Sequence, residues 1–318
     1  MPQKVIKSIK SYIKNDKALA EFDYADSKDV YLASVKEFDE QSNIIKEIGY
    51  RPDGLIDNHY TNTFNNTGQL IEHAVYDDGD ELLQTHKYDY NPEGEMIGIA
   101  SFFAEMGDSD YTHILYNDKG LIIEKRNMDS DDDLYSTIKF EYKDDKLVKE
   151  CHYNDDNKLE SEKQFVYNDK GVLMEESEID HLDNDKRVFK YEYDSAGSRT
   201  KMLMYNMKDQ LIMRISYEFN EDGKNVKQVE EDQKGISTTL FGYTNDGQYD
   251  FQEKYDADGA LVVRWEYKYQ DGLLVETGTY FREEKTTEKN DEDENEEDSP
   301  EFELVKRIST DFIYEFYN

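Results

Sequence analysis

The segment YDADGALVVRWEYKY, from Tyr255 to Tyr269, contains a turn and the strand that follows it. Asp256 can open the turn, because an Asp side chain accepts hydrogen bonds from backbone groups just beyond it, and Gly259 closes it at a position that requires positive φ. From Leu261 to Tyr269 apolar or aromatic residues alternate with other residues, most of them charged. This period of two is typical of a half-buried β-strand, whereas a helix needs apolar spacings of three and four.

The same unit recurs along the chain. The aromatic residues that end successive strands lie 24 to 26 residues apart, and most of the intervals are 26. They are Tyr12, Phe38, Phe64, Tyr90, Tyr116, Tyr142, Tyr167, Tyr193, Phe219, Tyr243 and Tyr269. A second, weaker series falls between them, so each repeat is predicted to hold two strands and two turns.

Turn residues follow these aromatics. Asn117 to Gly120 and Asn168 to Gly171 have an Asn that opens a turn and a Gly that closes it. Where the Gly is missing, Asn157 or Asp209 stands in its place. Asn and Asp tolerate positive φ better than other non-glycine residues, so these positions also predict hairpin turns.

The pattern predicts an all-β fold: a long antiparallel meander of tandem 26-residue, two-strand repeats that forms a single domain over residues 1–318. One strand of about eight or nine residues and one turn of about four residues make each step, so the whole chain is predicted to hold about 24 strands. Twist accumulates in a long sheet, and an aromatic face must be covered. We therefore expect the sheet to coil into a spiral, a solenoid or a partial shell, with the aromatic ladders inside.

One acidic segment interrupts the repeat, over residues 283–301. Its charge block cannot bury itself, and the strand pattern resumes at Phe312, Tyr314 and Phe316, so we expect a disordered insertion within a hairpin. The candidate partner-binding residues are the acidic ones of this block: Asp291, Glu292, Asp293, Glu294, Glu296, Glu297 and Asp298. Solvation of the chain explains these charges equally well.

Two segments, Tyr88 to Met96 and Tyr191 to Gly197, have the form Tyr-x-Tyr-Asp/Asn-x-x-Gly. This form resembles the YD repeat of the Rhs family, in which the repeats build a strip of strands that spirals into a hollow shell, often around a toxin domain. The chain is too short for a complete shell and lacks the DPxGxxxG-like segment that precedes the toxin. The resemblance therefore implies a curved YD-like sheet and a role in bacterial competition.

Composition narrows the classes of partner. The chain has 38 basic and 74 acidic residues, a formal net charge of −36, which disfavours binding to nucleic acid or to an anionic membrane and attracts basic proteins. The single cysteine, Cys151, excludes an internal disulfide framework. Met1 to Lys17 has no apolar run of signal-peptide length, and no stretch has the 18 or so apolar residues that span a bilayer. We expect a soluble, cytoplasmic protein.

No catalytic motif stands out. Cys151 and His152 are adjacent, so in a strand they face opposite sides and cannot share a metal. Asp129 to Asp133 resembles the start of a calcium loop, but Phe140 occupies the position of the bidentate acid, which favours a solvated hairpin turn. The Gly-x-Ser-x-Gly, phosphate-loop and HExxH patterns are missing from the sequence. We expect no enzyme activity, no cofactor and no metal site.

The leading hypothesis is a non-catalytic protein that binds a basic protein partner, and its most specific form is an immunity protein against a bacterial toxin. The first alternative is a structural or scaffold module of a secretion or surface assembly, which would form large oligomers. The second is a carbohydrate-binding repeat protein that uses aromatic rows such as Trp265, Tyr267 and Tyr269.

Overall fold

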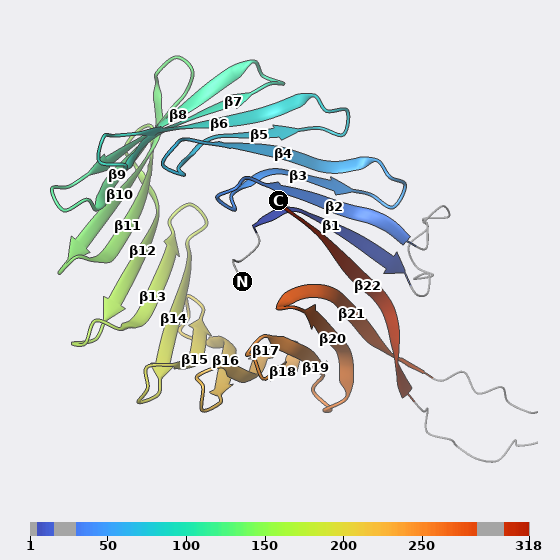
Figure 1. Ribbon diagram of the computed structural model, residues 1–318. Helices are drawn as coiled ribbons and strands as arrows, with labels where there is room; N and C mark the ends of the chain where they lie inside the picture. The colour runs from blue at the N-terminus through green and yellow to red at the C-terminus, as the bar shows by residue number, and fades with distance from the viewer. Residues whose placement is uncertain (1–4, 16–29, 285–301, 318) are drawn as a thin grey trace, which may run out of the picture.

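The computed structural model describes residues 5–15, 30–284 and 302–317, and these residues form 22 β-strands of one antiparallel sheet (Figure 1). The strands are β1 (Ile6–Asn15), β2 (Val30–Phe38), β3 (Ile44–Tyr50), β4 (Ile56–Phe64), β5 (Leu70–Tyr76), β6 (Leu82–Tyr90), β7 (Met96–Phe103), β8 (Asp108–Tyr116), β9 (Ile122–Met128), β10 (Leu134–Lys143), β11 (Lys146–Asn154), β12 (Leu159–Tyr167), β13 (Leu173–Asp180), β14 (Asp185–Tyr193), β15 (Arg199–Tyr205), β16 (Leu211–Phe219), β17 (Asn225–Asp232), β18 (Gly235–Tyr243), β19 (Tyr249–Tyr255), β20 (Leu261–Gln270), β21 (Leu273–Glu284) and β22 (Phe302–Phe316). The described residues contain no helix that could cross a membrane.

The sheet closes on itself. Each strand pairs with its neighbours in the chain, and β1 pairs both with β2 and with β22. The pairing of β1 with β22 runs from Ile6 opposite Phe316 to Asn15 opposite Ile308. Figure 1 shows the strands following one another around a ring, with β22 beside β1. Each strand therefore has a neighbour on both sides, so the sheet has no free edge strand.

This closure corrects the expected fold. The all-β class and the antiparallel meander are confirmed, but the open spiral, solenoid or partial shell of about 24 strands is wrong. The strand number was too high because the step of one strand and one turn was applied to all 318 residues. Closure was missed because it depends on the pairing of the first and last strands, which leaves no trace in a local pattern.

The connections lie at two edges of the closed sheet. Edge A holds those that follow even-numbered strands, such as residues 117–121 between β8 and β9. Edge B holds those that follow odd-numbered strands, such as residues 129–133 between β9 and β10. The connections from β1 to β2 and from β21 to β22 also start and end at edge B.

The predicted turn chemistry is confirmed. At edge A the backbone N–H of Gly120 donates to the carbonyl of Asn117 (3.0 Å), and Asn117 Oδ1 accepts from the backbone of Lys119 (2.9 Å). Gly120 has φ of +74°. At edge B, Asn157 and Asp209 have φ of +57° and +56°, as expected for residues that replace glycine. Local sequence therefore sets the position of each turn.

Six tyrosines at or near the ends of even-numbered strands make the same kind of hydrogen bond. Their hydroxyls donate to the carbonyl of the first or second residue of the preceding strand, at edge A, which is the end of the hairpin that has no connection. The bonds are Tyr90 to Leu70 (2.8 Å), Tyr116 to Met96 (2.7 Å), Tyr167 to Leu147 (2.9 Å), Tyr193 to Leu173 (2.8 Å), Tyr243 to Asn225 (2.7 Å) and Tyr314 to Leu274 (2.7 Å). Each bond ties together two strands that follow one another in the chain, at the edge opposite their connection.

The two faces of the sheet differ. The aromatic face holds the residues in register with the strand-end aromatics, such as Ile138, Phe140 and Tyr142 in β10, and these are half-buried. The opposite face buries small side chains at the middle of strands, among them Cys151 and Val188. Among the described residues no large side chain is fully buried. Cross-strand pairs on both faces therefore supply much of the packing.

Candidate functional site

The predicted site residues lie outside the described residues. Asp291 to Asp298 belong to the connection between β21 and β22, so the structure gives no geometry for their carboxylates. Glu283 and Glu284, the first two residues of the predicted 283–301 segment, belong to β21 instead. The structure does describe the strands on either side of this connection, β21 and β22, and the other connections of edge B.

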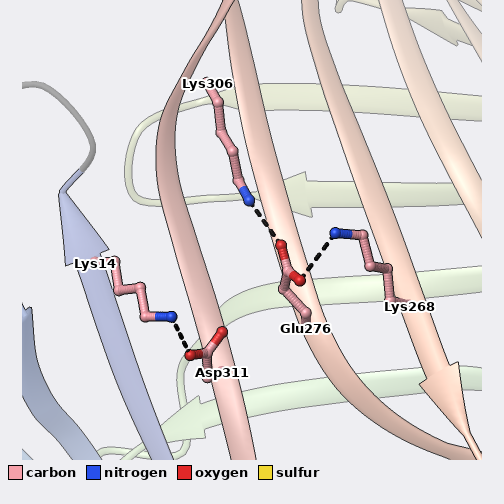
Figure 2. Close-up of polar contacts among 5 residues, drawn as sticks. All are labelled: Lys14, Lys268, Glu276, Lys306 and Asp311. Atoms are coloured by element: carbon pink, nitrogen blue, oxygen red, sulfur yellow. Dashed lines mark hydrogen bonds and ion pairs between the residues drawn. The ribbon is translucent and has the colours of Figure 1, made fainter.

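The strands next to the acidic connection carry a network of ion pairs, drawn in Figure 2. Glu276 of β21 accepts from Lys306 of β22 (2.6 Å) and from Lys268 of β20 (2.9 Å). These two ammonium groups hold the pKa of the Glu276 carboxyl at about 2. Asp311 of β22 forms an ion pair with Lys14 of β1. We call these five residues the closure network, because Lys268, Glu276 and Lys306 link β20, β21 and β22, and the Lys14–Asp311 pair links β22 to β1 across the closing seam.

A second pair of groups also crosses the seam. Glu315 of β22 accepts from Ser8 (3.1 Å) and Lys10 (3.3 Å) of β1, and these donors lower the pKa of its carboxyl. The backbone N–H of Tyr317 donates to the carbonyl of Val5 (3.0 Å), so the described residues before β1 and after β22 are also bonded to each other. The carboxylates at the seam thus serve to close the sheet, and their charge is balanced by lysines of the same chain.

Edge B presents carboxylates that are balanced less well. The connection 77–81 has four acidic residues and no basic one, and so does the connection 129–133, although Asp78 pairs with Arg51 of the neighbouring connection 51–55 (3.3 Å). In the second, Asp129 Oδ1 accepts from the backbone of Asp131 (3.0 Å) and Asp133 (2.9 Å). This confirms a hairpin turn in place of a calcium loop, and it leaves Asp131, Asp132 and Asp133 exposed. These groups can attract a cation or a basic protein from a distance.

The cysteine and its neighbour face opposite sides, as predicted. Cys151 is buried on the opposite face, with Sγ 4.0 Å from Glu162 Oε2, and Glu162 also pairs with Lys149 (2.6 Å). His152 lies on the aromatic face, where Nε2 is 2.7 Å from Glu150 Oε1. The described part of the chain contains no group of three or more His, Cys, Asp or Glu residues placed to hold a metal ion.

Sequence reasoning missed a buried histidine near edge B. His59 is 6% exposed and stacks on Tyr76, with ring centroids 4.7 Å apart. Its Nδ1 lies 2.7 Å from Asp80 Oδ1 of the connection 77–81, close enough for an ion pair but not aligned as a hydrogen bond. No local motif could have indicated this contact, because it requires the register of β4 on β5.

The aromatic rows proposed as a sugar platform are part of the sheet's packing. Trp265, Tyr267 and Tyr269 are half-buried on the aromatic face of β20. Burial raises the pKa of the Tyr267 and Tyr269 hydroxyls. Tyr267 lies beside Tyr249, with ring centroids 6.0 Å apart. Tyr267 thus has an aromatic neighbour on the adjacent strand.

No family model and no curated protein matches this chain. Among solved structures it is similar to TcdB2-TccC3 without its hypervariable C-terminal region, with 12% identity and a TM-score of 0.31. That alignment covers 80% of this chain and 18% of the other. It is also similar to a porin-like protein from Bacteroides uniformis, with 8% identity, a TM-score of 0.32, and coverage of 98% and 99%.

The chain thus spans about a fifth of the length of the TcdB2-TccC3 chain. Since these TM-scores are low, the description of the fold rests on the strand pairing within the chain itself. That pairing defines a β-rich repeat protein whose 22 described strands form one closed antiparallel sheet.

Proposed function

We propose that this chain is a non-catalytic repeat protein of the YD type that binds a basic protein, and specifically an immunity protein that neutralises a bacterial toxin. The observation that carries the proposal is the excess of exposed carboxylates at the connections. The formal net charge is −36, while the closure network uses its own carboxylates internally. The connections 77–81 and 129–133 carry eight acidic residues without a lysine or an arginine.

Electrostatics favours this class of partner. A protein with a strongly negative surface repels nucleic acid and anionic lipid and speeds its encounter with a basic surface. Because exposed charges are screened beyond about 10 Å at 0.1 M salt, the association rate falls as salt is added. An acidic protein that covers the basic cleft of a toxin would block it without any chemistry of its own.

The test begins with capture of partners from native lysate by the tagged chain at low and at high salt. A captured protein is then purified and titrated into the chain by calorimetry, and its toxic activity is assayed with and without the chain. We expect a basic partner in a 1:1 complex, salt-sensitive association and loss of toxicity. If no protein partner is captured at any salt concentration, the proposal is wrong.

Size-exclusion chromatography with light scattering separates this function from a scaffold role. An immunity protein is expected to be a monomer or a 1:1 complex. Large assemblies of the chain alone would favour the scaffold instead.

A further inference from the structure

Exposed apolar side chains are distributed unequally between the two edges of the sheet. Of the 19 large apolar residues that are exposed among the described residues, 13 lie within three residues of an edge B connection or in one. Five lie within three residues of an edge A connection, and Ile313 lies within β22. Scattered apolar side chains are normal on a protein surface, but their concentration at one edge indicates an interaction site.

Three of these residues lie on adjoining hairpins of edge B. Leu83 of β6 is 47% exposed, Met106 of the β7–β8 connection is 70% exposed, and Tyr135 of β10 is 45% exposed. The backbone N–H of Ala104 donates to the carbonyl of Leu83 (2.9 Å), so the β7–β8 connection lies against the start of β6. The Tyr135 hydroxyl donates to Asp110 of β8 (3.4 Å). We call Leu83, Met106 and Tyr135 the edge patch.

The edge patch lies beside the two most acidic connections that the structure describes. The connection 77–81 leads directly into β6, and 129–133 leads directly into β10. Their exposed carboxylates lie next to Leu83 and Tyr135 in the chain, and only Asp78 among them pairs with an arginine, Arg51. This combination excludes two occupants. A second copy would bring the same carboxylates together, and an anionic lipid surface would be repelled.

We propose that the edge patch and its flanking carboxylates form the docking site for a basic amphipathic segment of another protein, in which lysines or arginines flank apolar side chains. That the partner is a basic protein rests on the proposed function. The proposal adds where this partner binds and that apolar side chains take part in the contact. Covering the three side chains removes apolar surface from water, while the carboxylates pair with the flanking cations and fix the register.

The test uses a fluorescently labelled synthetic helix of leucine and lysine and measures its affinity by anisotropy. We expect the triple variant Leu83→Ser, Met106→Ser, Tyr135→Ser to weaken binding about tenfold or more. The matched control is Ile97→Ser, Leu115→Ser, Ile123→Ser at edge A, where the side chains are 37–39% exposed, and it should change binding less than about twofold. Equal losses in the two variants, or no loss in either, would overturn the proposal.

Two further arms separate the apolar contact from charge alone. A second peptide replaces each leucine with serine and keeps the lysines, and we expect it to bind at least about tenfold more weakly to the unmodified chain. If it binds equally well, the edge patch is not the docking site. That result would leave the proposed function, the binding of a basic protein, unaffected. A variant with Asp131, Asp132 and Asp133 changed to Asn should weaken the leucine–lysine helix without any change in apolar surface.

The remaining arms address the other occupants. Vesicles of neutral phosphatidylcholine and light scattering of the chain alone test for lipid and for a second copy. Binding to vesicles or dimer formation that the edge B triple variant abolishes would overturn the proposal. Circular dichroism and thermal unfolding check that each variant is folded. The Asn variant, which keeps the Asp129 turn contacts, tests the site independently if the apolar variant fails to fold.

Discussion

At the scale of single residues, tyrosine hydroxyls make the same kind of hydrogen bond at several hairpins along the chain. The hydroxyl of Tyr193 donates to the carbonyl of Leu173 (2.8 Å) at the open end of the β13–β14 hairpin. We expect Tyr193→Phe to lower the free energy of unfolding by about 1 kcal/mol, because the ring is kept and one hydrogen bond is lost. Urea denaturation measures the change.

The control is Tyr205→Phe, since the Tyr205 ring lies under the ammonium of Lys190 (5.4 Å) and its hydroxyl makes no such tie among the described residues. Its free energy of unfolding should change by less than about 0.5 kcal/mol. Equal effects of the two substitutions would show that the hydroxyl bonds do not support the hairpins.

The carboxyl of Glu276 makes stability depend on pH. Its pKa is lowered from 4.5 to about 2, chiefly by hydrogen bonds from Lys306 and Lys268. A lowered pKa in the folded state stabilises the fold above pH 4.5, and this contribution is lost as the pH falls toward 2. We expect Glu276→Gln to lower the free energy of unfolding by about 1–2 kcal/mol at pH 7, and the difference from the unmodified chain to shrink between pH 4.5 and 2.

Urea denaturation at pH 7, 4.5 and 3 measures that difference. Glu218→Gln is the control, because Glu218 pairs with Lys227 (2.8 Å) with 63% of its side chain exposed. An exposed pair contributes little, so this variant should stay within about 0.5 kcal/mol at every pH. A Glu276→Gln difference that does not vary with pH would contradict the role of the lysine pair.

At the scale of elements, strands and turns follow from local pattern. The strand over Leu261 to Tyr269 was predicted by alternation alone, and β20 covers those residues with one more. The turn glycines and their Asn and Asp substitutes were predicted by the need for positive φ, which depends only on steric contacts within a few residues. The two-strand repeat can therefore be predicted from the sequence without knowledge of the tertiary structure.

A turn glycine gives the prediction for this scale. Gly259 has φ of +76°, and a Cβ added there would meet no atom within 4 Å. We expect Gly259→Ala to lower the free energy of unfolding by about 1 kcal/mol, purely through backbone strain. Gly259→Asn should lower it less, since Asn157 already occupies such a position in this chain. Thermal unfolding compares the two, and a loss for Asn as large as that for Ala would contradict backbone strain at positive φ as the cause.

At the scale of the whole molecule, closure removes the edge strands. Deleting residues 302–318 takes away β22 and leaves β1 and β21 with unpaired backbone groups. We expect this variant to associate or aggregate, because an exposed strand edge is a template for pairing with another chain. Light scattering measures the mass in solution, and a stable monomer of this variant would show that closure is dispensable.

A circular permutant is the control for that deletion. The backbone N–H of Tyr317 donates to the carbonyl of Val5 (3.0 Å), so a short linker can join these two residues, with new chain ends placed between β21 and β22. All 22 strands are kept, so we expect this permutant to stay monomeric and folded. If the permutant aggregates, the order of the strands in the chain, and not the loss of strand pairing, would explain the aggregation of the deletion variant.

The candidate sites differ in how far the sequence reveals them. The acidic block from Asp291 to Asp298 is visible as a run of charge, but it lies outside the described residues. The closure network was not predictable, because Lys14 and Asp311 come from opposite ends of the chain and only the β1–β22 register brings them together. The edge patch was also hidden, since its three residues sit on three different hairpins.

The sequence by itself determined the strands, the turns, their 26-residue period and the excess of negative charge, because alternation, positive φ and net charge are properties of short segments or of composition. Only the tertiary structure decided that the sheet closes and which side chains meet across its seam. It also decided which of the two edges gathers the exposed apolar residues. Those features depend on pairing between strands far apart in the chain, and pairing of that kind is a property of the whole sheet.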